Sequence, residues 1–456
     1  MVECAPLGPR IRAWALAAAL AAAGCAPRGA LLAPREAYDK TRGETSAPLD
    51  VPGVPSATGL ELAPDPALQA LVDPHRQRGL AWLGGDVATS IPLSRSRWIW
   101  LFGDTILGRV EDHCPPPHAY CERRVDPDRV EESIVGNSIG TLRFDRTGRP
   151  QPIVKHWRTH AGVPEAIFPG EIEGEIVWPL AGLRIGRSLL VSASRHTREG
   201  GLAPFGNVFL RVTNPDDPPE RWRTIAYPIP YAIAEPGLTP LAWTTGLVLL
   251  GDHVFVIGQQ DVGFAARMVI ARMPVGHFDR PGWAPHPEYF ARARDGGPPT
   301  WRADAAMTEL VPIPGLPGTS EAVFELHPEL GWVTFQIPPL SFEIRMYTAP
   351  DLLGPWSERG TVYFIPPPWS TEAQVDCPMP LLACGFDEFA TYAAKSHPEL
   401  APPGGFAVTF NVNLANGSLE TAERAAEEHD AFYVPQFVAG VLPPGAAASA
   451  RASIAR

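Results

Sequence analysis

The stretch that decides the fold is Trp98-Ile-Trp-Leu-Phe-Gly-Asp-Thr105. It follows Trp82-Leu-Gly-Gly-Asp-Val-Ala-Thr-Ser-Ile-Pro-Leu93 across a short turn at Ser94 to Arg97. Apolar residues at successive positions indicate a strand that is buried on both faces. Together the two runs predict an antiparallel hairpin centred near Arg95.

That hairpin would place Asp86 and Asp104 opposite each other, about 5 Å apart at Cβ, because residues equidistant from a turn are cross-strand neighbours. Two carboxylates this close repel each other unless they share a proton, bind a cation or hold a polar ligand. The pair therefore indicates an active site or a metal site. The inference depends on register, since a slip of one residue would turn the two carboxylates to opposite faces.

Four further runs resemble the second strand of this hairpin. Each follows a turn rich in Gly, Pro or charge, and another apolar run precedes the turn. The runs are Ser188 to Arg195, His253 to Gln260, Trp332 to Ile337 and Phe406 to Asn413. Five such hairpins predict an all-β fold, a five-bladed β-propeller. The alternative is a two-sheet β-sandwich, which also uses alternating strands but needs no repeated unit.

A second element recurs at fixed spacing. Three segments begin with an Arg in a predicted strand and reach a Trp eleven residues later through a loop that contains Pro: Arg211 to Trp222, Arg272 to Trp283 and Arg345 to Trp356. The successive Trp residues are 61 and 73 positions apart, which suits four-stranded blades with long loops. The 53 Pro residues also favour strands and loops, and only Leu419 to His429 is predicted to be helical.

The N-terminus has the pattern of an export signal. Arg10 and Arg12 precede an apolar stretch, Ala13 to Ala23, that is too short to span a bilayer. The closing Ala22-Ala-Gly-Cys25 is similar to the lipobox of bacterial lipoproteins, in which the Cys is lipidated, and Ala26 points to an outer-membrane lipoprotein. We expect a signal peptide at 1–24, a flexible tether at 25–60 and the propeller at 61–456. An ordinary secretory signal is the alternative, and either signal exports the protein.

The charge of the chain limits its partners. The formal net charge is −12, and an acidic surface argues against binding to nucleic acid or anionic lipid. No other segment is long and apolar enough to cross a membrane, so we expect contact with the cell envelope through the lipidated N-terminus only. We expect a monomer.

The cysteines form two pairs with the same spacing. Cys114 and Cys121 are one pair, and Cys377 and Cys384 are the other. In an exported protein these pairs predict two local disulfides. His113 and His118 beside the first pair could be zinc ligands, but the Cys-x-x-Cys spacing that is common in zinc sites is missing.

Hairpin symmetry also predicts which residues lie at the level of Asp86 and Asp104 in the other blades. With turns near Gly186, at Gly251-Asp252 and at Pro328 to Leu330, the pairs are Glu175 with Arg195, Trp243 with Gln260, Glu321 with Gln336, and Tyr392 with Asn411. Carboxylates, amides and aromatic rings suit a sugar ligand. Structural alternatives remain, because Glu175 and Arg195 could form a salt bridge and Trp243 could belong to the core.

Several motifs resemble a known family. Gly84-Gly-Asp86, Ser90, Trp100-Leu-Phe-Gly-Asp-Thr105 and Asn137-Ser138 resemble the hallmark of a domain family long labelled as of unknown function, some of whose members are endo-acting D-arabinanases of the bacterial envelope. Gly354-Pro-Trp356, His397-Pro-Glu399 and Phe410-Asn-Val-Asn413 are similar to later blades of five-bladed glycosidases. The family motif often continues Gly-Gly-Asp-Gly, whereas Val87 stands at that fourth position here.

The resemblance implies a propeller glycoside hydrolase acting through acidic residues, with Asp86 and Asp104 as the best match. We expect it to bind and hydrolyse a polysaccharide, one that could contain arabinofuranose, with Asp86 or Asp104 as base or nucleophile and Glu175 or Glu321 as acid. The predicted substrate-binding residues are Arg195, Trp243, Gln260, Gln336, Tyr392, His397, Asn411 and Asn413. No cofactor is required, although oxygen ligands in the channel could hold Ca²⁺. The alternative is a non-catalytic surface propeller that binds glycan or protein.

Overall fold

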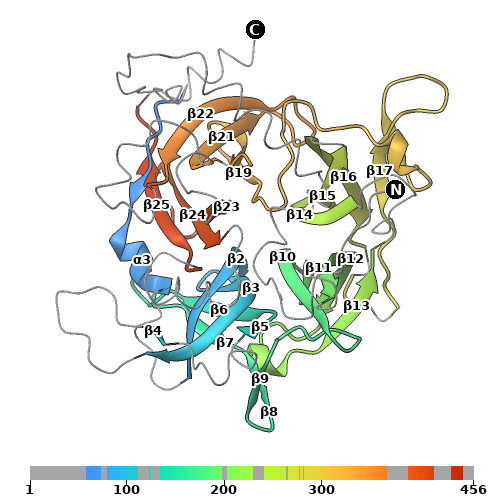
Figure 1. Ribbon diagram of the computed structural model, residues 1–456. Helices are drawn as coiled ribbons and strands as arrows, with labels where there is room; N and C mark the ends of the chain where they lie inside the picture. Colours follow the sequence, from blue (N-terminus) through green and yellow to red (C-terminus); the bar gives the residue numbers. More distant parts are fainter. Residues whose placement is uncertain are drawn as a thin grey trace, which may run out of the picture.

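The computed structural model describes residues 58–72, 80–110, 123–124, 134–197, 203–229, 241–262, 265–276, 278–280, 282–339, 341–366, 389–414 and 433–444. These residues form five main antiparallel sheets that stand around a central axis like blades (Figure 1). The predicted five-bladed β-propeller is therefore confirmed. Within the same described ranges, no helix is long and apolar enough to cross a membrane.

The blades follow one another along the chain, and the first strand of each lies nearest the axis (Figure 1). Blade 1 contains β2 (Leu80–Ser94), β3 (Arg97–Val110), β6 (Ser138–Arg143) and β7 (Val154–His156), with β4 (Arg123–Arg124) and β5 (Ile134–Val135) also paired to β3. Blade 2 contains β10 (Glu175–Ile185), β11 (Ser188–Thr197), β12 (Ala203–Val212) and β13 (Thr224–Pro228). Blade 3 contains β14 (Leu241–Leu250), β15 (His253–Val262), β16 (Ala265–Pro274), β17 (Glu288–Ala291) and β18 (Thr300–Arg302).

The last two blades differ in where their strands come from. Blade 4 contains β19 (Glu325–His327), β20 (Gly331–Gln336), β21 (Glu343–Ala349) and β22 (Ser357–Phe364). Blade 5 contains β23 (Phe389–Ser396), β24 (Gly405–Leu414), β25 (Gln436–Val441) and the N-terminal β1 (Ala63–Pro64). Helix α3 (Pro66–Val72) follows β1, and β8 (Arg158–His160) and β9 (Val163–Glu165) form a separate small hairpin.

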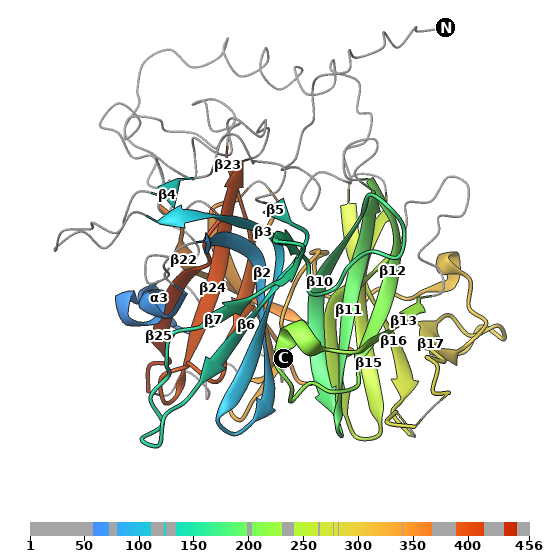
Figure 2. The ribbon, with the colours of Figure 1, turned by 90° about the horizontal axis from the view of Figure 1, so that it is seen from below.

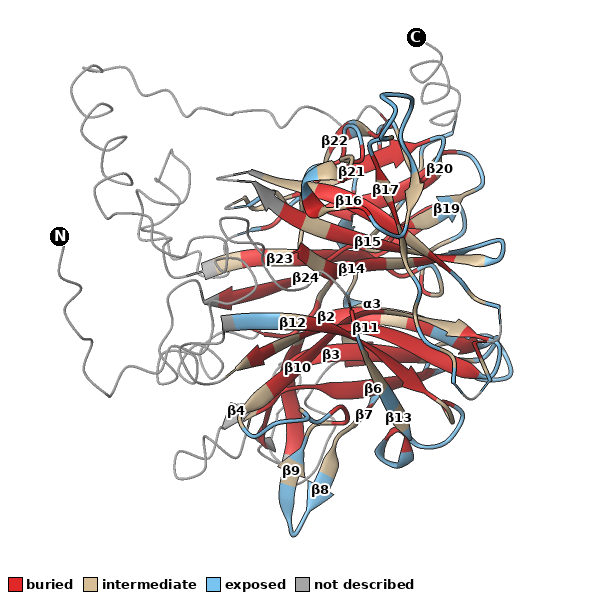
Figure 3. Cartoon of the chain, turned by 90° about the vertical axis from the view of Figure 1, so that its right-hand side faces the viewer, coloured by how far each residue is buried: buried red, intermediate tan, exposed pale blue. Residues whose placement is uncertain are grey.

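The five predicted hairpin strands are confirmed as the second strands of their blades, namely β3, β11, β15, β20 and β24. Their apolar character has a direct cause, because each blade is covered by its neighbours on both faces. Ile91 and Leu101 of blade 1, for example, share one buried cluster with Trp178 and Val191 of blade 2. Figure 3 shows the same burial along most strand lengths.

The Arg-to-Trp repeat marks the connection from the third to the fourth strand in blades 2, 3 and 4. Its Arg residues lie in β12, β16 and β21. The indole N–H of Trp222 donates to the backbone oxygen of Asp217 at 3.0 Å, and that of Trp356 donates to the oxygen of Leu352 at 3.2 Å. Trp222 and Trp356 are both buried, so the repeat fixes each connection against its blade.

Ring closure takes place within blade 5. Strand β25 pairs with β24 of its own blade, and the N-terminal β1 adds to the outer edge of β25 through Ala63 and Pro64. The ring therefore closes by uniting the two ends of the chain in blade 5. One contact does reach blade 1, where the Gly85 amide donates to the Tyr433 backbone oxygen at 2.7 Å.

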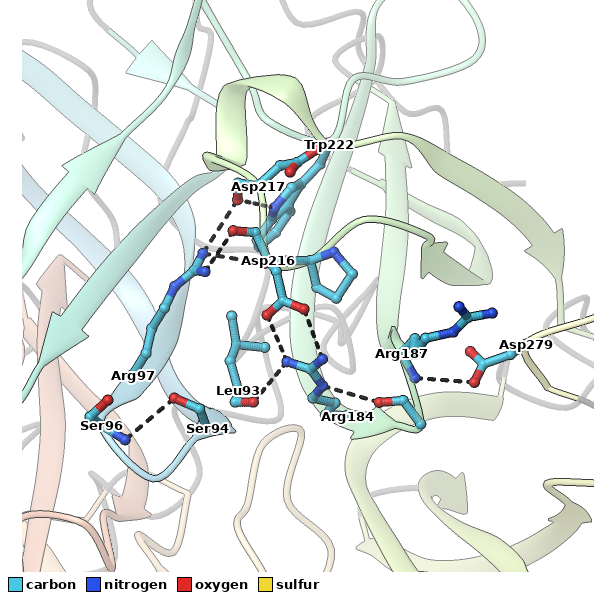
Figure 4. Close-up of polar contacts among 12 residues, drawn as sticks. Leu93, Ser94, Ser96, Arg97, Arg184, Arg187, Asp216, Asp217, Trp222 and Asp279 are labelled. Carbon is cyan, nitrogen blue, oxygen red and sulfur yellow. Dashed lines mark hydrogen bonds and ion pairs between the residues drawn. The ribbon is translucent and has the colours of Figure 1, made fainter.

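Two arginines tie the first blades together at the end where β2 turns into β3 (Figure 4). The Arg97 guanidinium donates to the backbone oxygens of Pro215, Asp216 and Asp217. Arg184 donates to the backbone oxygen of Leu93 at 2.7 Å and forms a two-pronged pair with the Asp216 carboxylate at 2.8 and 2.9 Å. We call Arg97, Arg184 and Asp216 the arginine latch.

Candidate active site

The candidate site is centred on Asp86, in the inner strand of blade 1. Gly85 pairs with Thr105 and Thr89 pairs with Leu101, which is the predicted register of this hairpin. Between these pairs the strands are irregular, and Asp86 lies at the level of Asp104. The predicted proximity of the two carboxylates is supported, because the charge of Asp104 contributes to the raised pKa of Asp86.

Burial is the largest cause of that change. It raises the pKa of Asp86 well above its ordinary value, and the charges of Glu321 and Asp104 raise it further. A hydrogen bond from the Tyr392 hydroxyl to Asp86 Oδ2, 2.9 Å long, and the Lys395 charge oppose the increase in part. Burial and the neighbouring carboxylates thus favour the protonated form of Asp86.

Asp104 has a different environment. Its Oδ1 accepts a hydrogen bond from the indole N–H of Trp178 in blade 2, at 2.8 Å, and the residue is 7% exposed. An N–H donor favours a carboxylate that carries charge. The two carboxyl groups therefore have different surroundings: Asp86 accepts a hydrogen bond from a tyrosine hydroxyl of blade 5, and Asp104 accepts one from an indole N–H of blade 2.

A buried ion pair borders Asp86. Lys395 Nζ of β23 lies 2.5 Å from Glu321 Oε2 and 2.5 Å from the Val87 backbone oxygen. Both side chains are almost fully buried, with 1% and 2% exposure. Burial lowers the pKa of Lys395, and the Glu321 charge opposes this. Lys395 thus joins blade 5, blade 1 and the segment that leads into blade 4.

Backbone strain gathers at the same place. Five described residues other than Gly have positive φ, and four of them are Val87 (68°), Ala88 (52°), Ala393 (57°) and Tyr433 (59°). Such conformations cost roughly 1–3 kcal/mol each and cluster at functional sites. Val87 is the clearest case, because a β-branched residue tolerates this region poorly, and its strained peptide presents the oxygen that Lys395 binds.

The glycines of the first-blade motif have a steric role. A Cβ at Gly103 would lie 2.4 Å from Asp86 Oδ1, and a Cβ at Gly84 would lie 2.6 Å from the Tyr433 backbone oxygen. Gly103 therefore leaves room for the Asp86 carboxyl, and Gly84 lets blade 5 approach blade 1. The motif carries this site because its small residues allow both contacts.

The blade 5 residues agree with their predicted places. Tyr392 pairs with Asn411 across β23 and β24, as hairpin symmetry predicts. The Asn413 amide lies 3.4 Å from the Tyr392 hydroxyl. Asn411 is fully buried, and neither its oxygen nor its nitrogen has a hydrogen-bond partner among the described residues. Tyr392 and Asn413 thus belong to the shell around Asp86.

The pKa of Glu175 changes in the opposite direction from that of Asp86, and Glu175 does not contribute to the raised pKa of Asp86. Its strand partner is Thr197, not Arg195, because the turn lies at Gly186-Arg187 and the strands are irregular near Pro179. The long Arg195 side chain still reaches it, with Nε 2.5 Å from Oε1. Burial favours its protonated form, but the hydrogen bonds from Arg195 and two backbone amides outweigh burial and lower the pKa of Glu175. This is the salt bridge that the sequence left open as the structural alternative.

Two other predicted pairs are wrong. Gln260 pairs with Leu241 because β14 carries extra residues between Ala242 and Gly246, and Trp243 in that irregular stretch is a buried core residue against Tyr289. Gln260 Oε1 instead accepts from Arg267.

The Glu321 pair fails for another reason. Glu321 lies before β19, in a stretch where the Ala322 amide donates to the Thr245 backbone oxygen of blade 3. The pairing of β19 with β20 begins only at Glu325, which lies opposite Val333. Gln336 pairs with Arg345 across β20 and β21. Glu321 nevertheless reaches the site through Lys395.

His397 occupies a second buried layer. Its Nδ1 lies 2.9 Å from Ser90 Oγ, its Nε2 lies 2.7 Å from Thr409 Oγ1, and its ring stacks on Trp100 at 4.3 Å. Burial and the Lys395 charge lower the pKa of His397 to about 3, so the ring is neutral. Nearby, burial raises the pKa of Glu399 to about 8. His397 therefore serves as a buried polar link between blades 1 and 5.

Sequence reasoning missed Lys395, Trp178 and Tyr433. The sequence does carry a signal for Lys395, because it is the single charged residue in the otherwise weakly polar run Phe389 to Ser396. Trp178 resembled any core aromatic, and Tyr433 lies far from the motifs. Cys25, Cys114, Cys121, Cys377 and Cys384 lie outside the described residues. Within those residues, no group of three or more His, Cys, Asp or Glu is placed to hold a metal ion.

Comparison with known proteins concerns the fold. No protein-family model matches the chain, and no curated protein matches it. A candidate hydrolase from Bacteroides ovatus ATCC 8483 aligns with a TM-score of 0.56 at 14% identity, covering 87% of this chain and 97% of that chain. A family 117 glycoside hydrolase from Zobellia galactanivorans has a TM-score of 0.40 at 12% identity over 79% of this chain and 85% of its own.

At 14% identity, the first of these likenesses shows a shared fold alone. By its own architecture the protein is a five-bladed β-propeller with a buried carboxyl cluster around the inner strand of blade 1.

Proposed function

We propose that the protein is a glycoside hydrolase that cleaves a polysaccharide. The observation that carries the proposal is the pair of carboxyl groups at one level of blade 1: burial raises the pKa of Asp86, and Asp104 accepts a hydrogen bond from an indole N–H. Divergent environments of two carboxyl groups are what acid and base roles require.

In the proposed reaction, Asp86 donates its proton to the glycosidic oxygen as the bond between that oxygen and the anomeric carbon breaks. Asp104 either takes a proton from the attacking water or attacks the anomeric carbon itself before water releases the sugar. The Glu321 carboxylate beside Asp86 favours its acid form, and the Lys395 ammonium that is paired with Glu321 opposes this in part. Glu175, held in the Arg195 salt bridge with a lowered pKa, is a poorer acid than Asp86.

The family resemblance supports the same residues. The motif of the D-arabinanase-containing family falls on Gly84 to Asp86 and Gly103 to Thr105, which surround the cluster. The Gly that often follows Asp in that motif would fit the positive φ of 68° at Val87 without strain. A polysaccharide that contains arabinofuranose is therefore the substrate we propose first.

The cellular setting belongs to the same proposal. A lipid anchor at Cys25, disulfides Cys114–Cys121 and Cys377–Cys384, and a monomeric protein in the outer membrane would suit an enzyme that meets extracellular polymers. Labelling cells with a radioactive fatty acid should mark the wild type and leave Cys25→Ala unmarked. Labelling of both proteins would exclude anchoring at Cys25.

The decisive experiment incubates the purified protein with arabinan, arabinogalactan, xylan and other plant and bacterial polysaccharides and measures released reducing ends. Asp86→Asn and Asp104→Asn should each lose at least ~100-fold of the activity, the usual scale for a positioned acid or base. Both should keep the fold, since Asn is nearly isosteric with Asp. Glu175→Gln should lower the melting temperature more than the activity.

The outcomes separate the two candidate functions. Full activity in both Asn variants would remove Asp86 and Asp104 from the chemistry. Saccharide binding by a wild type that releases no reducing ends would favour the non-catalytic glycan-binding propeller.

A further inference from the structure

A cavity of about 470 Å³ lies at the junction of blades 3 and 4, apart from the carboxyl cluster. One wall is the segment 315–318, which precedes β19 and runs beside blade 3, where the Gly318 amide donates to the Ala266 oxygen at 3.3 Å. The other wall comes from blade 4 and includes Gln336, Pro339, Arg345, Tyr347 and Glu358.

The cavity connects with the candidate site along the chain. Gly318 in its wall is three residues before Glu321, a span of at most about 10 Å in an extended chain. The Thr319 hydroxyl donates to the Glu321 backbone oxygen at 3.2 Å, which fixes this short segment. A chain-like ligand that reaches the carboxyl cluster could therefore continue into the cavity.

One polar group in the wall lacks a partner. Gln336 is 3% exposed, and its Nε2 has no hydrogen-bond partner among the described residues. A buried amide N–H₂ without an acceptor destabilises the protein, and a ligand oxygen bound there would supply the missing hydrogen bond. Gln260, the corresponding Gln of blade 3, has no such vacancy, because its amide bonds to Arg267 and to the Met307 oxygen.

The charges of the wall select the chemistry of the ligand. Arg345 is paired with Glu343 at 2.9 Å and with Glu358 at 3.3 Å, so its charge is already balanced and the cavity does not favour an anion. The Tyr347 hydroxyl donates to Glu358 Oε2 at 3.3 Å, so donors and acceptors alternate along the wall. Hydroxyl groups both donate and accept, and they match this arrangement.

Apolar carbon completes the lining. Leu316 and the neighbouring Pro338 and Pro339 present carbon–hydrogen surface beside the polar groups. A wall that combines such surface with a few fixed polar groups is typical of small-molecule sites. A pyranose or furanose ring has the same two kinds of surface.

We propose that this cavity is an accessory subsite that binds a neutral sugar unit of the polysaccharide, next to the units held at the carboxyl cluster. The inference rests on the proposed glycoside hydrolase function and deepens it, because it specifies an uncharged polymer engaged across blades 3 and 4. Uronic acid or phosphate-bearing chains are disfavoured, since no unbalanced cation in the cavity would receive their charge.

Two variants test the subsite, and a third is their control. Gln336→Met removes the amide while keeping the side-chain length, and Pro339→Trp places a large ring at an exposed position of the wall. The control is Pro152→Trp, because Pro152 is also exposed but lies between β6 and β7 of blade 1. Melting temperatures should be the same for all four proteins.

Calorimetric titration with arabinohexaose, xylohexaose and cellohexaose, together with the matching disaccharides, gives the readout. For a hexasaccharide that the wild type binds, Gln336→Met and Pro339→Trp should weaken affinity about tenfold or more and raise KM on the parent polymer. Affinity for the disaccharide and the behaviour of Pro152→Trp should not change. A loss of disaccharide binding as well would mean that the cavity belongs to the main site.

Failure of the subsite and failure of the enzyme assignment look different. If the wild type releases reducing ends and both cavity variants keep its hexasaccharide affinity and KM, the subsite is wrong and the hydrolase assignment stands. If the wild type neither cleaves nor binds any saccharide of the panel, both the hydrolase assignment and the subsite are wrong. Tighter binding of a charged hexasaccharide, tested with hexagalacturonic acid, would overturn the neutral ligand.

Discussion

Two regions that contain aspartate show how position decides chemistry. Asp216 of the arginine latch has a side chain that is 64% exposed, and its hydrogen bonds to Arg184 lower its pKa (Figure 4). Asp86 lies among other carboxyl groups at the inner strands, and burial raises its pKa. The same side chain is part of a charged structural tie in one region, and it holds its proton more tightly in the other. Positive φ angles occur at Val87 and Ala88 beside the cluster, whereas the three latch residues have none.

Removing the Lys395 ammonium should produce the largest effect. Lys395→Met leaves the Glu321 carboxylate buried without its cation, which typically costs about 3–5 kcal/mol. Urea unfolding should report this loss. The double variant Lys395→Met/Glu321→Leu should recover most of it, because an apolar pair replaces the ion pair. A single variant as stable as the wild type would show that the pair is not a structural requirement of the cluster.

Stability should fall with rising pH because of Glu399. Its pKa rises from 4.5 to about 8 in the folded protein, through burial first, so the folded state holds this proton more tightly. Its contribution is complete below pH 4.5 and is lost as pH rises through about 8. A pKa difference of one corresponds to roughly 1.4 kcal/mol, so the effect is on the order of a few kcal/mol.

Glu399→Gln should flatten unfolding free energies measured between pH 5 and pH 8. The pH dependence that Asp216 contributes to stability has the opposite sign. Its pKa is lowered in the folded protein, so its contribution is present above pH 3.8 and is lost as pH falls. Equal pH slopes for the wild type and Glu399→Gln would contradict a buried proton on Glu399.

Two buried alanines of β2 allow the backbone strain at the cluster to be measured. Ala88 and Ala81 are both 0% exposed, but only Ala88 has a positive φ, 52°. Ala88→Gly relieves about 1–2 kcal/mol of left-handed strain and should be neutral or slightly stabilising. Ala81→Gly should lose roughly 1 kcal/mol. Thermal unfolding of the two variants measures the difference, and equal losses would argue against stored strain at Ala88.

We expect the smallest loss of stability from a change in the arginine latch. Asp216→Asn breaks an exposed pair with Arg184, so it should cost about 0.5 kcal/mol at most and leave hydrolysis unchanged. Parallel urea unfolding and reducing-end assays of Asp216→Asn and Asp86→Asn give the comparison directly. A large loss of activity in Asp216→Asn would remove the distinction between the two regions.

The sequence predicted the blades better than the contacts between them. Turns at Gly186 and Gly251 and the strands around them follow from local patterns, because two-residue hairpins need few long-range contacts. Irregular stretches such as Ala242 to Gly246 shift register without a local signal, so Trp243 and Gln260 were misplaced. The pair of Asp86 and Asp104 was found because its hairpin is nearly symmetric. Lys395 was missed because its partners are far away in sequence.

The seam between the first and last blades also sets when the site exists during folding. The bonds from Tyr392 to Asp86 and from Lys395 to Val87 join residues 306 and 308 positions apart. Contacts of such sequence separation form late, because a long loop must close before they are gained. Blades 2, 3 and 4 can acquire their hairpins while Asp86 still lacks its neighbours. The carboxyl cluster is therefore complete only once the whole ring has formed, and a half-folded chain would lack the surroundings that raise the pKa of Asp86.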